Sequence, residues 1–435
     1  MNKAVKTAVI QAGGLGTRLR ELTKNQIPKP LLQLDGKPMI THQIDCLKEQ
    51  GITDFVIITG YLGEKLCEHF GDGSSLGVKI SYIHENQPLG SAGALYYLKD
   101  MIKDDFMLIF GDVMFDIDVG RMVSFHLKNN ALATLLVHPN SHPYDSDLIM
   151  SDKNGCVTGF DSKNNKRDYL YDNCVNAGIY ILSPGIFKEI TEPVKTDLEK
   201  DLLFPLIDSG RIYAYRTTEY VKDAGTVDRF LAVSEDHRKG LWHNKRLSNP
   251  QKCIFIDRDG TLNKHNGLIS DISQIVLEDN AAEAVRLINT SGYLAICVTN
   301  QPVVARGMCS IEEVEDIHRK MCMMLGENGA YLDDIVFCPH HPDKGYPEEN
   351  PEYKIKCSCR KPSVGMIEEM TGKYNIDLSE SYIIGDTTVD IQTGKNAGIK
   401  TVLVHTGEGG KDSKYSVTPD IEAEDILSAV KKILL

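Results

Sequence analysis

Two aspartates separated by one residue, Asp257 and Asp259, follow a short apolar run at residues 253–256. Carboxylates spaced in this way at the carboxyl end of a strand can share a divalent cation such as Mg²⁺. The turn at residues 260–261 leaves backbone N–H groups free for phosphate oxygens. This spacing predicts a site for phosphate chemistry in the second half of the chain.

A glycine-rich turn near the start of the chain is a second candidate for phosphate binding. It contains Gly13, Gly14, Gly16 and Thr17 and follows a β-like run at residues 6–10. Such a turn presents N–H groups to a phosphate. It lacks the third glycine of the GxGxxG pattern and the GK[ST] ending of a Walker A loop, so neither common nucleotide-binding motif is supported.

Three cysteines and two histidines form a third cluster in the sequence, with Cys338, Cys357 and Cys359 close to His340 and His341. The eleven cysteines are otherwise scattered irregularly, which argues against a disulfide framework. Three thiols and one histidine match a structural zinc site. Free thiols in an apolar core are the alternative interpretation.

Alternating strand and helix patterns must position these residues. Strand-like runs at 54–60 and 104–112 precede a charged helical pattern at 228–239, and a helix then leads into a strand within 281–300. A Gly-rich and Pro-containing stretch at 240–250 interrupts the pattern. We therefore predict two α/β domains, residues 1–245 and 246–435. Trp242 would either pack at the junction or lie exposed in the linker.

Composition limits the class of protein and its partners. The chain has 435 residues, 42% of them hydrophobic and 25% charged, which suits two or three globular domains. A formal net charge of −13 argues against nucleic acid or an anionic membrane as a partner. The first residues contain no long apolar region, and no stretch approaches the roughly 20 apolar residues of a membrane span, so we expect a cytoplasmic protein.

The first half of the chain resembles the sugar-1-phosphate nucleotidyltransferases from residue 5 to about 230. The resemblance rests on GGxGTRL followed by PKPL at residues 28–31. It implies a Rossmann-like α/β domain in which a sugar-phosphate oxygen attacks the α-phosphorus of a nucleoside triphosphate. The implied residues are Arg18 and Lys29 for catalysis; Gly13, Gly14, Gly16, Thr17, Gln87, Gly90, Lys163 and Asn176 for substrate binding; and Asp112 and Asp223 for Mg²⁺.

Two positions depart from this family's usual pattern. Ser162 precedes Lys163 where the family usually has glutamate, and Tyr220 replaces a tryptophan. Both changes concern the sugar side of the implied site. The reaction class is retained, and the identity of the sugar stays open.

In the second half, DxDGTL resembles the first motif of the haloacid dehalogenase superfamily. The resemblance implies that Asp257 is the nucleophile and Asp259 the general acid/base. It also implies that Thr299 and Lys361 hold the phosphoryl group, and that Asp386 completes a Mg²⁺ site with Asp257 and Asp259. Only about forty residues separate the first two motifs, so no large cap domain is expected between them.

The cysteine cluster, together with ARG at 305–307 and CSCRKP at 357–362, resembles the zinc-loop subfamily of heptose bisphosphate and histidinol phosphatases. The resemblance favours His340 over His341 as the fourth Zn²⁺ ligand. It also implies that Asn300, Arg306 and Arg360 bind the substrate. Residues 302–304 and Thr387 depart from the subfamily's pattern, which leaves the substrate preference open.

Taken together, the two resemblances imply consecutive reactions. A 7-phosphatase makes a heptose 1-phosphate, and a nucleotidyltransferase consumes a sugar 1-phosphate. We therefore expect a bifunctional enzyme of GDP-heptose biosynthesis that acts on heptose phosphates and GTP, the base being inferred from the pathway alone. The alternatives are a mannose-type nucleotidyltransferase joined to a phosphatase of other specificity, and a regulator that binds sugar phosphates. A homo-oligomer is left open.

Overall fold

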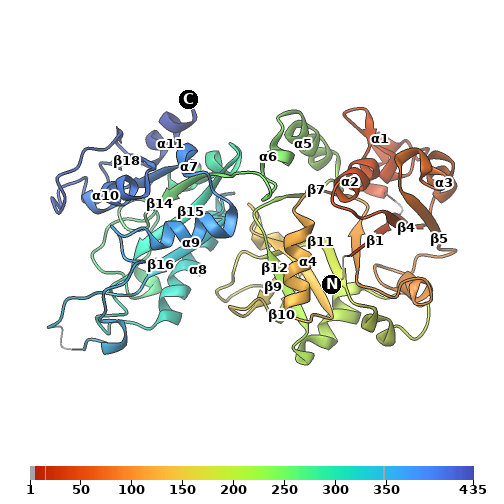
Figure 1. Cartoon of the computed structure of the whole chain (residues 1–435), viewed down its shortest axis with the longest axis horizontal. Helices are drawn as coiled ribbons and strands as arrows, with labels where there is room; N and C mark the ends of the chain where they lie inside the picture. Colours follow the sequence, from red (N-terminus) through yellow and green to blue (C-terminus); the bar gives the residue numbers. More distant parts are fainter. Residues whose placement is uncertain (1–4, 15, 346–347) are drawn as a thin grey trace. The chain divides into compact units, whose positions relative to one another are not determined.

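The computed structural model describes residues 5–14, 16–345 and 348–435, and the chain divides into two compact units (Figure 1). The first unit extends to His138 and also contains Asp147–Ser162 and Cys174–Arg246. The second unit contains Pro139–Ser146, Lys163–Asn173 and Leu247–Leu435. Each unit has its own sheet and its own apolar core, so each is described by itself.

A nine-stranded mixed sheet forms the centre of the first unit. Its strand order is β10-β9-β11-β6-β1-β4-β5, with β8 paired to β11 and β12 paired to β8. The strands of the first unit are β1 (Thr7–Gln11), β2 (Gln33–Leu34), β3 (Lys37–Pro38), β4 (Asp54–Thr59), β5 (Lys79–His84), β6 (Phe106–Phe110), β7 (Val113–Asp116), β8 (Ala133–His138), β9 (Leu148–Ser151), β10 (Val157–Asp161), β11 (Val175–Leu182), β12 (Ile212–Arg216) and β13 (Tyr220–Asp223).

Both faces of this sheet are covered, which explains why its central strands β1, β4 and β6 are buried along most of their length. In β1, Ala8 and Ile10 face one core cluster, and Val9 faces the other. The first cluster includes residues of the helices α2, α3 and α4; the second includes the 3-10 segment Gly93–Leu98. The helices of this unit are α1 (Arg20–Thr23), α2 (Met39–Lys48), α3 (Gly63–Phe70), α4 (Val119–Lys128), α5 (Val227–Arg238) and α6 (Leu241–Asn244).

A two-stranded sheet of β7 and β13 lies outside the main sheet and brings two distant stretches together. Asp223 at the end of β13 pairs with Val113 at the start of β7. Trp242 lies in α6 and is 6% exposed. It stacks on Tyr220 within the first unit, with ring centroids 5.3 Å apart, and is therefore not an exposed linker residue.

The second unit contains a six-stranded sheet in the order β16-β15-β14-β17-β18-β19, and every pairing in it is parallel. Its elements are β14 (Lys252–Ile256), β15 (Tyr293–Asn300), β16 (Asp334–Cys338), β17 (Tyr382–Gly385), β18 (Lys400–Val404), β19 (Ile421–Ala423), α7 (Ala281–Asn289), α8 (Ile311–Glu327), α9 (Gly365–Tyr374), α10 (Thr388–Ala397) and α11 (Ile426–Leu434).

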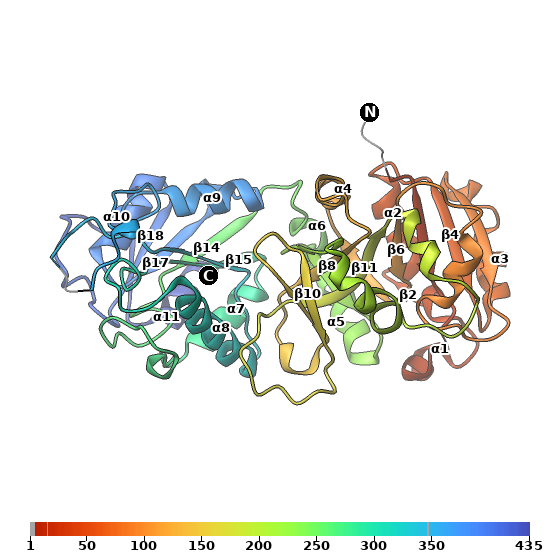
Figure 2. The same cartoon turned by 90° about the horizontal axis from the view of Figure 1, so that it is seen from below.

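Helices lie on both faces of this parallel sheet (Figure 2). Apolar residues of α7, α8 and α11 pack on one face, and apolar residues of α9 pack on the other. The carboxyl ends of β14, β15 and β17 consequently meet at one edge, where ligands of open α/β sheets usually bind. The predicted fold class, two α/β domains, is confirmed. Among the residues that the structure covers, none of the helices combines the length and apolar character required to span a bilayer.

Candidate active sites and metal centre

The carboxyl edge of the second unit's sheet brings together three of the predicted residues. Asp257 follows β14, Thr299 lies near the end of β15, and Asp386 follows β17. These three residues are 9%, 1% and 1% exposed. The N–H of Asp257 donates to the carbonyl oxygen of Ile384 at 2.9 Å. This bond holds the first residue after β14 against the neighbouring strand β17.

Lys361 is buried between two aspartates at this edge. Its Nζ lies 2.8 Å from Asp257 Oδ1 and 2.5 Å from Asp390 Oδ1, and it also donates to the carbonyl oxygen of Val298. Asn300 holds the backbone of Lys361 in place by accepting from its N–H and donating to its carbonyl oxygen. The positively charged amino group of Lys361 therefore lies beside the predicted nucleophile, where a phosphoryl group would bring further negative charge.

Asp257, Asp386 and Asp390 form a carboxylate cluster whose oxygens lie within 4.8 Å of one another. Oδ2 of Asp386 accepts from the N–H of Glu408 at 2.7 Å, whereas the buried Oδ1 has no hydrogen-bond partner among the described residues. Hard oxygen donors with an unsatisfied buried oxygen fit Mg²⁺. Two residues of the predicted magnesium set lie in this cluster, and Asp390 is its third member.

Two of these carboxyl groups, Asp257 and Asp386, have raised pKa values. Burial, followed by the charge of Asp390, raises the pKa of Asp257 to about 7, although Lys361 opposes the shift. Burial, followed by the charge of Asp257, raises the pKa of Asp386 to about 8. Both groups are therefore poised to lose a proton when a cation binds.

Asp259, the predicted general acid/base, lies outside this carboxylate cluster. Its two oxygens accept from the guanidinium of Arg258, and Gln301 donates to Oδ2 at 2.9 Å. Arg258 is completely buried, and His318 lies 3.2 Å from its Nη1. Burial and the charge of Arg258 lower the pKa of His318 well below its usual value, so the imidazole is neutral and accepts this bond.

Two glycines leave room for Asp386. A Cβ atom on either Gly260 or Gly407 would overlap Asp386 Oδ2, and the two glycines also contact each other. Their φ angles are +81° and +56°, a region that favours glycine. Thr406 Oγ1 donates to the carbonyl oxygen of Gly260 at 2.7 Å, so the two loops close together over the carboxylate cluster.

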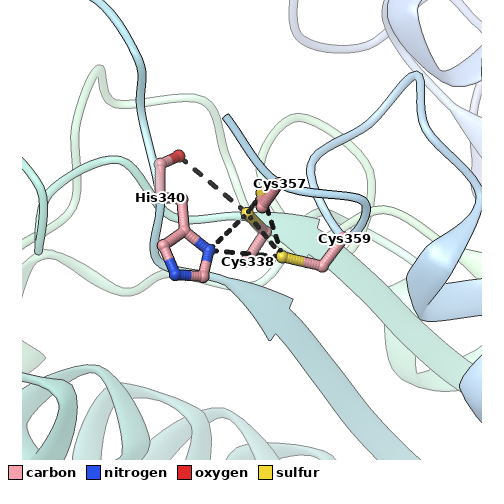
Figure 3. A group of neighbouring side chains, drawn as sticks. All are labelled: Cys338, His340, Cys357 and Cys359. Carbon is pink, nitrogen blue, oxygen red and sulfur yellow. Dashed lines mark hydrogen bonds between the residues drawn. The ribbon is translucent and has the colours of Figure 1, made fainter. Parts of the chain in front are cut away.

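Cys338, His340, Cys357 and Cys359 gather at the end of β16 (Figure 3). Cys359 Sγ lies 3.2 Å from both other sulfurs, and His340 Nδ1 lies 3.3 Å from Cys359 Sγ and 3.7 Å from Cys338 Sγ. The four donor atoms therefore form a compact set. The sulfur–sulfur separations in it are far longer than a disulfide bond. Three sulfurs and one imidazole nitrogen fit a tetrahedral Zn²⁺.

His341 does not belong to this four-donor set. Its Nδ1 accepts from the N–H of Asp343 at 3.2 Å, and its own N–H donates to the carbonyl oxygen of Tyr353. Arg360 follows the last cysteine and donates to the carbonyl oxygen of His340 at 3.0 Å. Burial, together with the smaller effect of the charge of Arg306, lowers the pKa of Arg360.

In the first unit, an ion pair joins two residues predicted to act on the triphosphate. Lys29 Nζ contacts Asp112 Oδ2, and Asp112 follows β6 after a single glycine. The carbonyl oxygen of Asp112 accepts from the N–H of Ala224, next to Asp223. Asp223 Oδ1 accepts from the N–H of Gly225 at 2.8 Å and from Arg229 at 3.2 Å. The two predicted magnesium ligands of this unit are therefore held near each other.

Arg18 and the glycine turn lie beside these carboxylates. A Cβ atom on Gly225 would be 3.4 Å from Arg18 Nη2. Gly16 has a φ of +60° and precedes the short helix that begins at Thr17, whereas Gly13 and Gly14 follow β1. These N–H groups and the exposed guanidinium of Arg18 lie near the carboxyl edge of the parallel strands.

Gln87 and Gly90 lie in the loop that follows β5. Gln87 is exposed, and a Cβ atom on Gly90, whose φ is +76°, would overlap the carbonyl oxygen of Thr196. Ser91 joins this loop to other segments, since its carbonyl oxygen accepts from Gln11 and its hydroxyl accepts from the N–H of Leu198. The loop is thus tied to β1, the strand that leads into the glycine turn.

Asn176, the predicted sugar-contacting residue, forms a small polar group with two residues that sequence reasoning missed. It donates to Tyr180 Oη at 2.7 Å and to Glu199 Oε1 at 2.8 Å, and Tyr180 also donates to Glu199. Burial raises the pKa of Glu199. Lys163, by contrast, opens the segment Lys163–Asn173, which belongs to the second unit.

Comparison with known proteins relates the two halves of the chain to two families. The nucleotidyl transferase family matches residues 7–240, and the HAD-hydrolase-like family matches residues 358–429. The D-glycero-beta-D-manno-heptose-1,7-bisphosphate 7-phosphatase of Haemophilus ducreyi is 39% identical over 160 residues, which are 36% of this chain and 85% of that protein. The chain belongs to both the nucleotidyl transferase and the heptose bisphosphate phosphatase families.

Each of the relatives described here matches one half of the chain. A mannose-1-phosphate guanylyltransferase of Mycobacterium tuberculosis is 32% identical over 237 residues and covers 54% of this chain, which in turn spans 65% of that relative. A D,D-heptose 1.7-bisphosphate phosphatase from B. bronchiseptica, whose crystal structure contains magnesium and phosphate, is 28% identical to the matched part of this chain. The match covers 42% of this chain and 98% of that protein, with a TM-score of 0.38. The family matches of the two halves and the heptose bisphosphate phosphatase relatives of the second half show that the chain is a fusion of a nucleotidyltransferase with a phosphatase-like region.

Asp390 is the main residue of the phosphatase site that sequence reasoning missed. It forms a capping box with Thr387 at the start of α10, and its other oxygen binds Lys361. A Thr-x-x-Asp pattern directly after the Gly385–Asp386 strand end was the available signal. Arg258 and His318 carried no comparable signal, because their roles depend on burial.

Proposed function

We propose that the chain is a bifunctional enzyme that acts on two consecutive heptose phosphates. The second unit removes the C7 phosphate of D-glycero-D-manno-heptose 1,7-bisphosphate. The first unit, a sugar-1-phosphate nucleotidyltransferase, then transfers GMP from GTP to heptose 1-phosphate and releases pyrophosphate. The observation that carries this proposal is the presence of two separate sets of carboxylates and cations, one in each unit.

In the phosphatase reaction, a carboxylate oxygen of Asp257 attacks the phosphorus of the C7 phosphate. A bond forms between that oxygen and phosphorus, the bond from phosphorus to the sugar oxygen breaks, and Asp259 gives its proton to the leaving oxygen. Asp259 then takes a proton from a water molecule that attacks the aspartyl phosphate, which releases inorganic phosphate and restores Asp257. Mg²⁺ bound at Asp257 and Asp386 would neutralise phosphoryl charge.

Lys361 and Thr299 hold the phosphoryl group during both steps. Lys361 lies 2.8 Å from Asp257, so it neutralises charge beside the nucleophile. The hydroxyl of Thr299 lies 3.0 Å from Gln301 Nε2, which itself donates to Asp259. Lys361 thus contacts the nucleophile, and Thr299 is connected through Gln301 to the acid/base. Asn300, Arg306 and Arg360 would bind the rest of the bisphosphate.

In the transfer reaction, an oxygen of the sugar phosphate attacks the α-phosphorus of GTP, and the bond to the β-phosphate breaks. The nucleophile is already an anion, so catalysis requires alignment and charge neutralisation more than a base. Arg18 and Lys29 would neutralise the triphosphate, and Mg²⁺ would bind at Asp112 and Asp223. Asn176 would bind the sugar. Lys163, which the sequence predicted for the sugar phosphate, lies in a segment of the second unit and is not assigned to this site.

The sequence of the second half supports the heptose assignment, because its relatives include heptose bisphosphate phosphatases at 34–39% identity. The relatives of the first half include mannose-1-phosphate guanylyltransferases at 31–32% identity. They support a guanylyltransferase, and they also make mannose 1-phosphate the second candidate acceptor. The sites are proposed to lie in domains 1–245 and 246–435, with one structural Zn²⁺ on the cysteine cluster.

Incubation of the whole chain with heptose 1,7-bisphosphate, Mg²⁺ and each nucleoside triphosphate in turn tests the proposal. Mass spectrometry should detect phosphate release with every nucleotide, and GDP-heptose with GTP alone. Parallel reactions supply heptose 1-phosphate, mannose 1-phosphate or histidinol phosphate. Transfer of GMP to mannose 1-phosphate, with no transfer to heptose 1-phosphate, would overturn the heptose assignment. Release of phosphate from histidinol phosphate, with none from the bisphosphate, would overturn it as well.

A further inference from the structure

Asp259 is held on its inner side by a buried arginine. Nε of Arg258 donates to Asp259 Oδ1 at 3.1 Å, and Nη2 donates to both carboxylate oxygens at 3.0 Å. Gln301 and Asn263 add one donor each, at 2.9 and 3.1 Å. The side chain of Arg258 is not exposed at all, whereas the side chain of Asp259 is 21% exposed. The donors therefore fix the carboxylate from the protein interior and leave its outer side accessible.

Arg258 also connects the predicted general acid/base to the predicted nucleophile. Its N–H donates to Asp257 Oδ1 at 2.7 Å, while its side chain binds Asp259. Its carbonyl oxygen accepts from the N–H groups of Leu262 and Asn263, which closes the turn after Asp259. The relative position of the two carboxylates therefore depends on this one residue.

His318 completes the contacts of the guanidinium from a different element. It lies in α8 and is 6% exposed, and its ring packs edge-on against Phe337 with centroids 5.2 Å apart. Its Nε2 lies 3.2 Å from Arg258 Nη1. Because a guanidinium has only donors, Nε2 is the acceptor and the ring is neutral. Nη2 of Arg258 also donates to Gln301 Oε1 at 2.9 Å, so each nitrogen of the guanidinium has a partner.

Packing alone does not account for an arginine at this position. A buried guanidinium requires a counter-charge and partners for its N–H groups, and an apolar side chain could fill the same space without that cost. Among the described residues, the salt-bridge partner of Arg258 is Asp259. A guanidinium offers paired donors in a rigid plane, which fix the orientation of a carboxylate more strictly than a single donor does.

We propose that Arg258 and His318 are positioning residues for the general acid/base. Arg258 fixes the carboxylate of Asp259, and the neutral ring of His318 fixes Arg258. This inference rests on the proposed phosphatase reaction, in which Asp259 gives a proton to the leaving oxygen as its bond to phosphorus breaks, and then takes a proton from the attacking water. Both transfers require Asp259 within hydrogen-bond distance of the reacting oxygen, so a carboxylate free to rotate would slow both.

The basicity of the leaving group separates this role from general damage to the site. The alkoxide that leaves a sugar phosphate is strongly basic and requires the proton of Asp259. The nitrophenolate that leaves 4-nitrophenyl phosphate is weakly basic and departs without one. Hydrolysis of the aspartyl phosphate requires Asp259 as a base with either substrate. A badly positioned Asp259 should therefore spare only the first step with 4-nitrophenyl phosphate.

His318→Leu removes the acceptor for Arg258 and keeps a side chain of similar size. Phosphate release from heptose 1,7-bisphosphate should fall by about tenfold or more. With 4-nitrophenyl phosphate and Mg²⁺, rapid mixing should show a burst of one nitrophenolate per chain at nearly the unmodified rate, followed by turnover that is slower by about tenfold or more. His318→Gln supplies an acceptor again and should restore both rates. Met321→Leu, also on the buried side of α8, is the matched control and should change neither.

Arg258→Lys keeps the charge without the paired donors and should show the same burst. A burst slowed as much as hydrolysis of the bisphosphate would overturn the inference, because it would show damage to the nucleophile itself. Unchanged hydrolysis of the bisphosphate in His318→Leu would overturn it too. If the unmodified chain cleaved 4-nitrophenyl phosphate but not the bisphosphate, the heptose assignment would fail, and the burst would still decide this inference. An unmodified chain that cleaves neither ester would overturn both.

Discussion

Asp257 is the residue on which the proposed phosphatase reaction depends, because its carboxylate is both the nucleophile and part of the carboxylate cluster. Asp257→Asn keeps the shape and removes the nucleophile. We expect phosphate release to fall by several powers of ten, and transfer of GMP to supplied heptose 1-phosphate to continue. Phosphate and nucleotide-sugar assays on the same preparation measure both.

The reciprocal change is Asp112→Asn in the first unit. It should stop transfer and leave phosphate release intact, so that heptose 1-phosphate accumulates. Loss of transfer in folded Asp257→Asn would show that the two sites are not independent and would contradict the proposed sequence of reactions.

His318 gives the second unit a distinctive response to acid. Its pKa lies well below the ordinary value in the folded protein, so the unfolded chain binds more protons below a pH of about 6.5. Stability should therefore be lost as the pH falls through this range, at up to about 1.4 kcal/mol per pH unit for this one group. His318→Gln keeps an acceptor for Arg258 but cannot be protonated.

Urea unfolding of the second unit at a series of pH values measures this effect. Between pH 7 and pH 5.5, the free energy of unfolding should fall by about 1 kcal/mol less in His318→Gln than in the unmodified protein. Parallel pH curves for the two proteins would show that His318 does not titrate in this range.

The residues that the sequence predicted and those that it missed differ in a physical way. Asp257, Asp386 and Cys338 lie at strand ends, and an apolar run followed by a polar residue is visible without a structure. Arg258 lies in the same loop as Asp257, but its role depends on its complete burial beside Asp259, which only the folded arrangement reveals. The choice between His340 and His341 likewise depends on which ring reaches the sulfurs.

At the scale of elements, the cysteine cluster shapes the loop that carries Arg360. We expect about one Zn²⁺ per chain, measured by elemental analysis of protein purified without a chelator. Removing the zinc, or Cys357→Ser, should loosen this loop and reduce phosphatase turnover far more than nucleotidyl transfer. Zinc-free protein with full phosphatase activity would contradict the assignment.

The loop after β18 contacts the carboxylate cluster through Gly407. Gly407→Ala would press a methyl group against Asp386, whereas Gly398→Ala would introduce the same positive-φ strain in open space. Each change should cost about 1–2 kcal/mol of stability through backbone strain. Phosphatase activity should fall at least about a hundredfold in Gly407→Ala alone, and steady-state kinetics with thermal unfolding separate the two effects.

Element order was predictable to different degrees in the two units. In the second unit, strands and helices alternate and every strand is parallel, so the sequence periodicity led directly to the sheet. In the first unit, β8, β9, β10 and β11 form antiparallel pairs, and the second face is partly covered by short 3-10 segments such as Gly93–Leu98. Such short segments have no periodic pattern long enough to recognise.

At the scale of the whole molecule, we predict that the two reactions can be separated. Fragments 1–245 and 246–435 should each keep their own reaction, because each contains its own strands and carboxylates. The second fragment lacks Pro139–Ser146 and Lys163–Asn173, so a lower thermal stability is expected, but every catalytic residue assigned to it lies after residue 246. Loss of both activities in soluble, folded fragments would contradict this independence.

The chain passes into the second unit for the last time at Leu247, which packs in the same apolar cluster as Cys253 and Phe255 of β14. Only a few residues later it becomes this central strand, which is hydrogen-bonded to β15 on one side and β17 on the other. A force directed along β14 would load both rows of hydrogen bonds in shear. Under such a load the strand that leads to Asp257 would leave its sheet only when both rows rupture together.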